Sequence, residues 1–268
     1  MRVSIADALG RASARLSEAG CDTPRLDAEL LLAEALGVDR ERLVLDAAEP
    51  LGEGASERFD ALLARRAARE PVAYILGRKE FRRITLAVDP RVLIPRPETE
   101  RLVEVGLTVP PGARVIDVGT GSGAVALALK HERPDLTVLG VDLSADALEV
   151  ARANAARLGL DVDFVLGDLL NGVEGPVDGV LANLPYVAEG VVLAPEISRY
   201  EPPAALFGGP DGLDVIRRLV AMAKGVPVIA MEVGLPQAVS TLLERAGFES
   251  IEVLRDLADH ERVVVARG

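Results

Sequence analysis

Beyond residue 95 the sequence alternates between short apolar runs and longer amphipathic segments. The apolar runs predict strands at 113–118, 137–142, 162–167, 177–182 and 226–232. The amphipathic segments predict helices at 98–107, 123–131, 145–157, 212–224 and 236–246. Because strands that alternate with helices form parallel sheets covered on both faces, this pattern predicts a mostly parallel α/β sheet. Two last strands, at 250–255 and 261–266, are expected to close it as an antiparallel pair.

The first 75 residues or so have a purely helical pattern. Apolar positions at helical spacing predict one helix ending at Gly20, a second over 24–36, a third near 40–45 and a fourth from 56 to 71. Residues 72–95 then predict a β-hairpin, with Asp89-Pro90-Arg91 as its turn. We therefore expect a helical domain over 1–74, a hairpin connector over 75–95 and an α/β domain over 96–268.

Composition excludes several classes of protein. The net charge of −12 disfavours sequence-independent binding to nucleic acid, which depends on neutralising phosphates. No uncharged apolar run approaches the ~18–20 residues of a membrane span, and the N-terminus has the pattern of an amphipathic helix rather than of a signal peptide. The single cysteine, Cys21, cannot form an internal disulfide and so favours a reducing cytosol. Neither histidine has a partner at ligand spacing, so no metal site is expected.

The first predicted strand of the α/β domain runs into a glycine-rich turn, Asp117-Val118-Gly119-Thr120-Gly121-Ser122-Gly123. Glycines allow a tight turn and bring bare backbone against a ligand. The spacing also fits a dinucleotide fingerprint. However, Asp117 would repel a pyrophosphate, whereas it could face a cationic amino acid group. S-adenosylmethionine has such a group and no phosphate, so the segment favours this methyl donor over a dinucleotide.

Two further strand ends carry carboxylates. Asp142, about twenty residues after the glycine turn and followed by Leu143, could accept hydrogen bonds from both hydroxyls of a ribose, or could cap the helix starting near 144. Asp168 could accept from an adenine amino group, and Leu169 could cover the ring. Both the methyl donor and a dinucleotide carry that ribose diol, so Asp142 does not separate the two, and Asp168 could also be an ordinary turn residue.

The fourth strand ends in Asn183-Leu184-Pro185-Tyr186. A planar amide or aromatic amine nitrogen is a poor nucleophile, and its methylation requires acceptors that hold its N–H bonds and aim the nitrogen at the methyl group. The Asn183 side-chain oxygen and the Leu184 carbonyl could provide these acceptors. Pro185 restricts Leu184 to extended geometry, and Tyr186 could pack against a flat substrate group.

With these motifs the chain resembles the protein-(glutamine-N5) methyltransferases that modify peptide-chain release factors. The resemblance covers nearly the whole chain. It includes the segments 71–77, 94–100, 117–123, 200–206, 208–213 and 232–234. The Pro95-Arg96-Pro97-Glu98-Thr99-Glu100 segment is highly specific, whereas the glycine turn is shared by many methyltransferases.

The resemblance implies a class I methyltransferase-type, Rossmann-like fold and a cytoplasmic enzyme of translation termination. The enzyme would transfer a methyl group from S-adenosylmethionine to the glutamine side chain of a Gly-Gly-Gln loop, leaving S-adenosylhomocysteine. The release factor would dock with help from the helical domain, and we expect a monomer that forms no stable nucleic-acid complex. Asp117, Gly119–Gly123, Asp142, Leu143, Asp168 and Leu169 would hold the donor, with Asn183 beside it. Asn183–Tyr186 would hold the glutamine amide, and Pro97, Glu98 and Thr99 would wall the entrance.

One position departs from the family pattern. The family usually has Asn-Pro-Pro-Tyr, whereas residue 184 is Leu. Asn-Leu-Pro-Tyr is typical of ribosomal RNA adenine dimethyltransferases, so an RNA adenine-N6 methyltransferase is the alternative. Their extra helical domain follows the catalytic domain rather than preceding it, and the acidic charge also disfavours RNA. A nicotinamide-dependent oxidoreductase is disfavoured by Asp117, and a non-catalytic binding module by the intact Asn183.

Overall fold

The computed structural model describes residues 3–256 and 258–268. The chain divides into two compact units. One contains the residues up to Gly77 together with Leu193–Tyr200, and the other contains Arg78–Val192 together with Glu201–Gly268.

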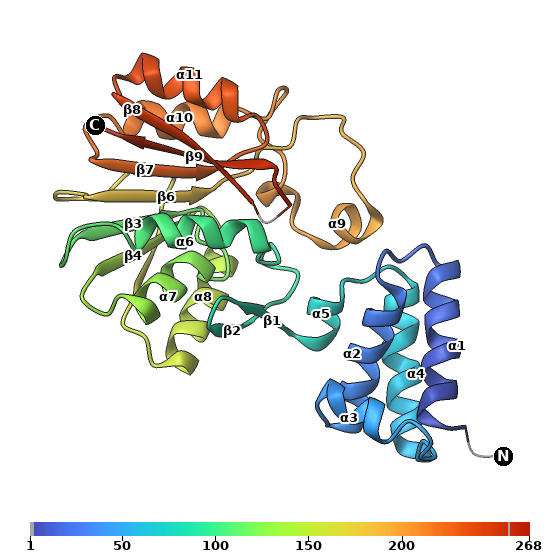
Figure 1. Cartoon of the computed structure of the whole chain (residues 1–268). Helices are drawn as coiled ribbons and strands as arrows, with labels where there is room; N and C mark the ends of the chain where they lie inside the picture. The colour runs from blue at the N-terminus through green and yellow to red at the C-terminus, as the bar shows by residue number, and fades with distance from the viewer. Residues whose placement is uncertain (1–2, 257) are drawn as a thin grey trace. The chain divides into compact units, whose positions relative to one another are not determined.

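The first unit is a bundle of helices (Figure 1). Its helices are α1 (Ile5–Glu18), α2 (Pro24–Leu36), α3 (Arg40–Leu45), α4 (Glu53–Ala67), α5 (Val72–Leu76) and α9 (Pro195–Tyr200). The first three helices confirm the sequence prediction. Helix α4 begins three residues before the predicted start and ends at Ala67, and the short helices α5 and α9 were not predicted. Apolar side chains such as Leu9, Leu16 and Leu31 form the core of the bundle.

Helix α9 lies far along the chain but is anchored to α4 by charge. Glu196 accepts hydrogen bonds from Arg66 over 3.0 Å and from Arg69 over 2.6 Å. Arg66 is buried and also donates to Asp27 over 2.7 Å. Tyr200 adds a bond from its hydroxyl to the Ala68 carbonyl, over 2.9 Å. The two carboxylate partners compensate the cost of burying the Arg66 charge, so this network holds residues 193–200 on the helical bundle.

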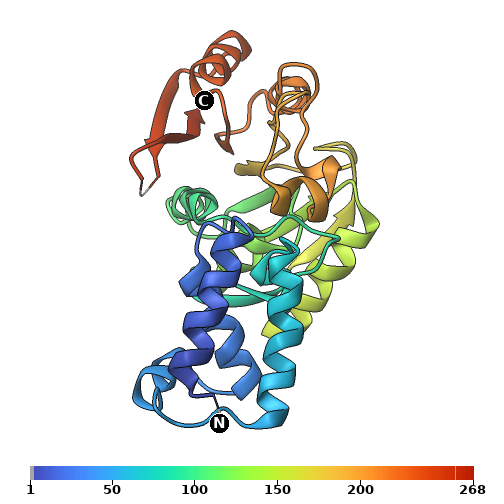
Figure 2. The same ribbon diagram turned by 90° about the vertical axis from the view of Figure 1, so that its right-hand side faces the viewer.

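The second unit is a seven-stranded sheet in the order β5-β4-β3-β6-β7-β9-β8 (Figures 1 and 2). Its strands are β3 (Arg114–Val118), β4 (Thr137–Asp142), β5 (Asp163–Leu166), β6 (Gly179–Asn183), β7 (Val228–Glu232), β8 (Ser250–Arg255) and β9 (Glu261–Arg267). Strands β3 to β7 pair in parallel, and β9 pairs antiparallel with both β7 and β8. The predicted parallel sheet and its antiparallel closing pair are therefore confirmed.

Helices cover both faces of this sheet because side chains alternate along its strands. The helices are α6 (Glu100–Gly106), α7 (Ala124–Glu132), α8 (Ala145–Leu158), α10 (Asp214–Met222) and α11 (Pro236–Ala246). On β6, Val180 and Ala182 belong to the core that contains α10 and α11. Leu181, between them, instead reaches Gly106 of α6, where an added Cβ would lie 3.0 Å from its Cδ1. The start of the predicted helix 98–107 is a separate 3-10 turn, η1 (Pro97–Thr99), and a second turn, η2 (Pro203–Ala205), was not predicted.

The predicted hairpin exists, but its turn lies elsewhere. Strands β1 (Arg78–Phe81) and β2 (Ile84–Ala87) are joined at Arg82-Arg83. The predicted turn at 89–91 does form, since the Val92 amide donates to the Asp89 carbonyl over 3.1 Å, but it follows β2 and does not connect the two strands. Arg82 adopts a left-handed φ of 48°. Its N–H is held by the Glu100 carboxylate over 3.1 Å and its guanidinium by Glu132 over 2.5 Å. These partners lie 18 and 50 residues along the chain, which is why local turn chemistry did not reveal them.

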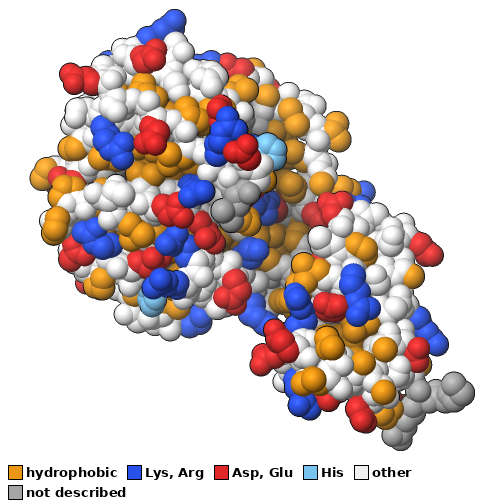
Figure 3. Space-filling view, viewed as in Figure 1, with side chains coloured by type: hydrophobic (Ala, Val, Ile, Leu, Met, Phe, Trp, Pro, Cys, Tyr) orange, Lys and Arg blue, Asp and Glu red, His pale blue; other side chains and the backbone are white. Residues whose placement is uncertain are grey.

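In the part of the chain that the structure describes, no helix is both long and apolar enough to cross a membrane. On the face of the α/β unit seen in Figure 3, acidic and basic side chains are interspersed rather than gathered by sign. Many charged side chains of the described part of this unit are paired, including Arg82 with Glu132 and Arg101 with Glu104.

Candidate active site

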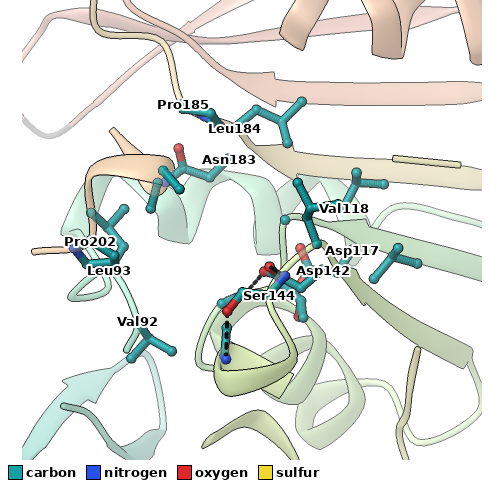
Figure 4. A pocket seen from close by; sticks show the side chains of 18 of the residues that line it. Val92, Leu93, Asp117, Val118, Asp142, Ser144, Asn183, Leu184, Pro185 and Pro202 are labelled. Carbon is teal, nitrogen blue, oxygen red and sulfur yellow. Dashed lines mark hydrogen bonds between the residues drawn. The ribbon is translucent and has the colours of Figure 1, made fainter. Parts of the chain in front are cut away.

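A cavity of about 400 Å³ lies at the carboxyl ends of β3, β4 and β6 (Figure 4). The strand order reverses between β3 and β6, because the chain moves outward through β4 and β5 and then returns to the other side of β3. Open α/β sheets bind ligands in the crevice at this switch point. The volume of the cavity is in the range of small-molecule sites. The pocket therefore lies where the sequence placed its unusual strand-end residues.

The glycine turn supplies bare backbone to the pocket. Gly119 and Gly121 line it with left-handed φ values of 74° and 55°. A Cβ added to Gly121 would meet nothing within 4 Å, so the backbone there faces open space that a side chain would fill. Gly123 points elsewhere: it caps α7, and an added Cβ would lie 2.9 Å from Leu127 Cδ1. Thr120 and Ser122, between the glycines, also line the pocket.

Asp117 is buried at the base of the pocket. Its Oδ2 accepts from Thr120 Oγ1 over 2.6 Å and from the Ala126 amide over 3.0 Å. Burial raises the pKa of Asp117 to about 6, although the bonds from Thr120 and Ala126 lower it; the charge of Asp142 raises it further. A cationic ligand group would favour the ionised carboxylate, because it offsets the cost of a buried charge.

Asp142 closes the glycine turn from the neighbouring strand. Its carboxylate accepts from the Gly121 amide over 2.8 Å and from the Ser144 amide over 2.9 Å. Burial raises the pKa of Asp142, while these backbone bonds lower it. The N-cap of α8 is Ser144, whose hydroxyl accepts from the Ala147 amide, and not Asp142. Asp142 thus bridges the glycine turn and the start of α8, and it lines the pocket with Leu143.

Asp168 and Leu169 line the pocket at the end of β5. Asp168 is ion-paired with Arg218 of α10. Leu169 is buried and adopts a left-handed φ of 58°, which is unusual for a residue other than glycine. Its side chain joins the main core, so this strained backbone is held by packing.

The charges around the pocket suit S-adenosylmethionine better than a dinucleotide. Among the described residues that line it, the two cations are Arg91 and Arg218. Arg91 is paired with Asp89 and Glu149, and Arg218 with Asp168. A pyrophosphate would therefore meet carboxylates and guanidiniums that are already paired, whereas the carboxylates Asp117 and Asp142 suit a ligand that carries hydroxyls and a cationic amino acid group. The bare backbone at Gly121 leaves room for such a ligand.

Three of the four predicted substrate-holding residues line the pocket, and the fourth, Tyr186, lies behind them. Asn183, Leu184 and Pro185 line the pocket, and Figure 4 shows them above the carboxylates Asp117 and Asp142. Tyr186 is not among the described lining residues. Its ring lies against Gly234, where an added Cβ would be 3.0 Å from Cδ2, and its hydroxyl donates to Glu232 over 3.2 Å. Burial, together with the charge of Glu232, raises the pKa of Tyr186 to about 12.

A buried chain of hydrogen bonds lies behind Asn183. Asn183 Nδ2 donates to Thr99 Oγ1 over 3.1 Å, and Thr99 Oγ1 donates to Glu232 Oε2 over 2.6 Å. Thr99 lines the pocket, whereas Pro97 and Glu98 line a separate cavity of about 180 Å³ with Glu100 and Asp256. Glu232 was not predicted as a site residue, although it ends a buried strand and begins the segment 232–234, which carried the family resemblance.

The loops opposite the strand ends complete the pocket. Leu93 and Pro95 come from one of them, and Pro202, Ala204 and Phe207 from the other. The two loops are joined by Arg96, which donates to the buried Glu201 over 2.5 Å. Pro95, Pro202 and Ala204 belong to segments that carried the family resemblance, but these three residues were not themselves predicted as site residues.

The strand order and the carboxylate-lined pocket together place the chain among the Rossmann-like, S-adenosylmethionine-dependent methyltransferases. In sequence, the methyltransferase small domain family matches residues 99–197, and the PrmC N-terminal domain family matches residues 7–77. The release factor glutamine methyltransferase of Deinococcus radiodurans is 43% identical over 276 residues, which cover 99% of each chain. That of Cereibacter sphaeroides is 43% identical over 275 residues, which cover 98% of each. The chain belongs to the release factor glutamine methyltransferase family.

Solved structures agree on the fold. The catalytic domain of hMettl16, crystallised with an RNA hairpin, matches with a TM-score of 0.56 at 16% identity, over 76% of this chain and 80% of that one. A methyltransferase from Pyrococcus furiosus matches with a TM-score of 0.51 at 18% identity, over 68% and 87%. At these identities the likeness concerns the fold alone.

Proposed function

We propose that this enzyme transfers a methyl group from S-adenosylmethionine to the side-chain amide nitrogen of the glutamine in the Gly-Gly-Gln loop of peptide-chain release factors. The observation that carries the proposal is Asn183, held at the pocket above the carboxylates, in a chain that is 43% identical over its length to named release factor glutamine methyltransferases. S-adenosylhomocysteine would be the second product.

The residues around the glycine turn would hold the donor. When bound, S-adenosylmethionine supplies an electrophilic methyl group on a sulfonium centre. Asp142 would accept from the ribose hydroxyls, and Asp117 would face the cationic amino acid group. Leu143 and Leu169 would cover the adenine, and Asp168 would accept from its amino group while it remains paired with Arg218. Within the predicted Gly119–Gly123 turn, the stretch from Gly119 to Ser122 would form the backbone cradle, and Gly123 would support it by capping α7.

Asn183 and Leu184 would hold the glutamine amide. The Asn183 Oδ1 and the Leu184 carbonyl would accept its two N–H bonds and so aim the nitrogen, with Pro185 stiffening the loop. Such orientation is worth up to ~7–11 kcal/mol in favourable cases. Tyr186 would support the loop and keep its own proton, since its pKa is raised to about 12. No titrating base is needed, because the proton can leave after the nitrogen is methylated.

The remaining chain would bring the release factor to this pocket. We assign residues 1–74 to docking, 75–95 to the connector and 96–268 to catalysis. Pro97 and Glu98 would contact the entering protein, beside Thr99. The enzyme would act as a monomer in the cytoplasm, where release factors work, and would form no stable complex with nucleic acid.

The test is methyl transfer from labelled S-adenosylmethionine to a purified, unmodified release factor, with mass spectrometry to locate the label. The controls are a release factor whose Gly-Gly-Gln glutamine is replaced by alanine, and the Asn183→Ala enzyme. Label on that glutamine, lost in both controls, is the expected result. Label on ribosomal RNA instead of protein would overturn the proposal and favour the RNA adenine methyltransferase that Asn183-Leu184-Pro185-Tyr186 resembles.

A further inference from the structure

Glu232 lies next to Asn183 on the neighbouring strand, and the Thr99 hydroxyl links the two side chains by hydrogen bonds. Asn183 ends β6, Glu232 ends β7, and the two are paired in the parallel register. Both Glu232 and Thr99 are buried, with 2% and 4% of their surface exposed. Glu232 does not line the pocket, so it can influence the substrate only through its neighbours.

The chemistry of the three groups fixes the direction of every hydrogen bond. An ionised carboxylate only accepts, so the hydroxyl proton of Thr99 must point to Glu232, as must that of Tyr186. The remaining lone pairs of Thr99 Oγ1 then face Asn183, which can satisfy them only with its Nδ2. Among the described residues, none donates a hydrogen bond to Asn183 Oδ1.

We propose that Glu232 is a positioning residue that orients the Asn183 amide through the Thr99 hydroxyl, so that Oδ1 is presented to the substrate nitrogen. The inference rests on the proposed function, since it assumes that Oδ1 accepts from the glutamine amide. With the amide turned over, Nδ2 would face the substrate N–H, and two donors would oppose each other. A rigid carboxylate behind Thr99 prevents this turn without touching the substrate.

The first test compares two substitutions at Thr99. Thr99→Val keeps the shape and removes the hydroxyl, whereas Thr99→Ser keeps the hydroxyl. We expect Thr99→Val to lower kcat at least about tenfold with little change in KM, because the amide loses its fixed orientation. Thr99→Ser should stay within about threefold of the wild type, because its hydroxyl still fixes the orientation of the amide. Affinity for S-adenosylhomocysteine, measured by calorimetry, should change little in both.

The second test is Glu232→Gln, matched by Glu252→Gln at an exposed position on β8. A glutamine can donate or accept at the Thr99 side, so both orientations of Asn183 become available and kcat should fall; Glu252→Gln should leave kcat unchanged.

The pH dependence of kcat gives a third measurement. Burial raises the pKa of Glu232, against the bonds from Thr99 and Tyr186; the charge of Glu98 raises this pKa further and that of Arg262 lowers it. Wild-type kcat should therefore fall as acid protonates Glu232, and Glu232→Gln should flatten this limb of the pH profile.

The outcomes distinguish a failure of the positioning role of Glu232 from a failure of the proposed function. If the wild type methylates the glutamine but Thr99→Val and Glu232→Gln keep its kcat, the inference is wrong and the proposed function stands. If both variants lose S-adenosylhomocysteine binding in proportion to kcat, the network is structural and the inference is also overturned. If the wild type places no label on the glutamine, the proposed function itself has failed.

Discussion

The side chain of Leu184 packs directly over the backbone of Gly119. A Cβ added to Gly119 would lie 3.0 Å from Leu184 Cδ2 and 3.5 Å from the Asn183 carbonyl oxygen. Leu184 is 5% exposed and belongs to the main core of the α/β unit. The residue that departs from the usual family pattern therefore joins the substrate-holding loop to the glycine turn.

Replacing Leu184 by the family's proline should affect stability more than activity. Leu184→Pro keeps the carbonyl of residue 184, so methyl transfer should stay within about fivefold of the wild type if orientation is retained. It removes part of a buried side chain, and should cost about 1–3 kcal/mol of unfolding free energy, less than the ~2–5 kcal/mol typical of Leu→Ala. Denaturant unfolding followed by circular dichroism measures the loss, with Leu184→Ala alongside. A large drop in activity with the donor still bound would show that the side chain, and not the carbonyl alone, sets the loop.

Gly208 is expected to be essential for the position of the substrate-holding loop. A Cβ there would overlap the Pro185 carbonyl oxygen and lie 2.7 Å from that of Gly212. Gly208→Ala must push the loop away, and a displacement of ~1 Å can cost about a hundredfold in rate. Gly10→Ala is the matched control, because nothing lies within 4 Å of an added Cβ in that exposed part of α1. It should stabilise the helix by about 0.5–1 kcal/mol and leave the rate unchanged. Equal rates for both variants would contradict the prediction.

Asp117→Asn should stabilise the ligand-free protein while weakening donor binding. The pKa of Asp117 is raised to about 6, above its value of 3.8 in an unfolded chain. The folded state thus favours the protonated form, and the resulting penalty grows as pH rises from about 4 and is complete above about 6. Two pKa units correspond to about 3 kcal/mol at most. Melting curves at pH 7.5 with and without S-adenosylhomocysteine measure both effects: the variant should melt higher without ligand and gain less from it. An unchanged ligand-induced shift would show that Asp117 does not face the cationic group.

The anchor of α9 should weaken in acid. Burial raises the pKa of Glu196, but the bonds from Arg69 and Arg66 outweigh it and lower the pKa to about 2, against 4.5 in the unfolded chain. The stabilisation is therefore complete above pH 4.5 and is lost as pH falls towards 2, by about 2–3 kcal/mol. Circular dichroism suits the measurement because the chain contains no tryptophan. Glu196→Gln should lower stability at pH 7 and flatten its acid dependence, whereas Glu57→Gln, exposed on α4, should do neither.

Local periodicity was enough to predict most elements of the sheet and bundle. Strands β3 to β9 and helices α1 to α3, α7, α8 and α11 lie within a few residues of their predicted bounds. The prediction failed where short segments take their structure from distant contacts. Helix α9 is held by arginines 127 and 130 residues away, and the turn at Arg82 by Glu100 and Glu132. Neither has a periodic pattern long enough to be seen in the sequence.

The amino-acid sequence by itself determined which strand ends carry glycines, carboxylates and an amide, because alternation and turn chemistry act between close neighbours. It therefore indicated the edge of the sheet at which Asp117, Asp142 and Asn183 meet. The tertiary structure alone decided what stands behind them. Thr99 reaches Asn183 across 84 residues and Glu232 across 133, and Asp168 meets Arg218 across 50. Such pairings depend on strand order and on helix packing, and a hydrogen bond between buried groups leaves no periodic signal in the chain.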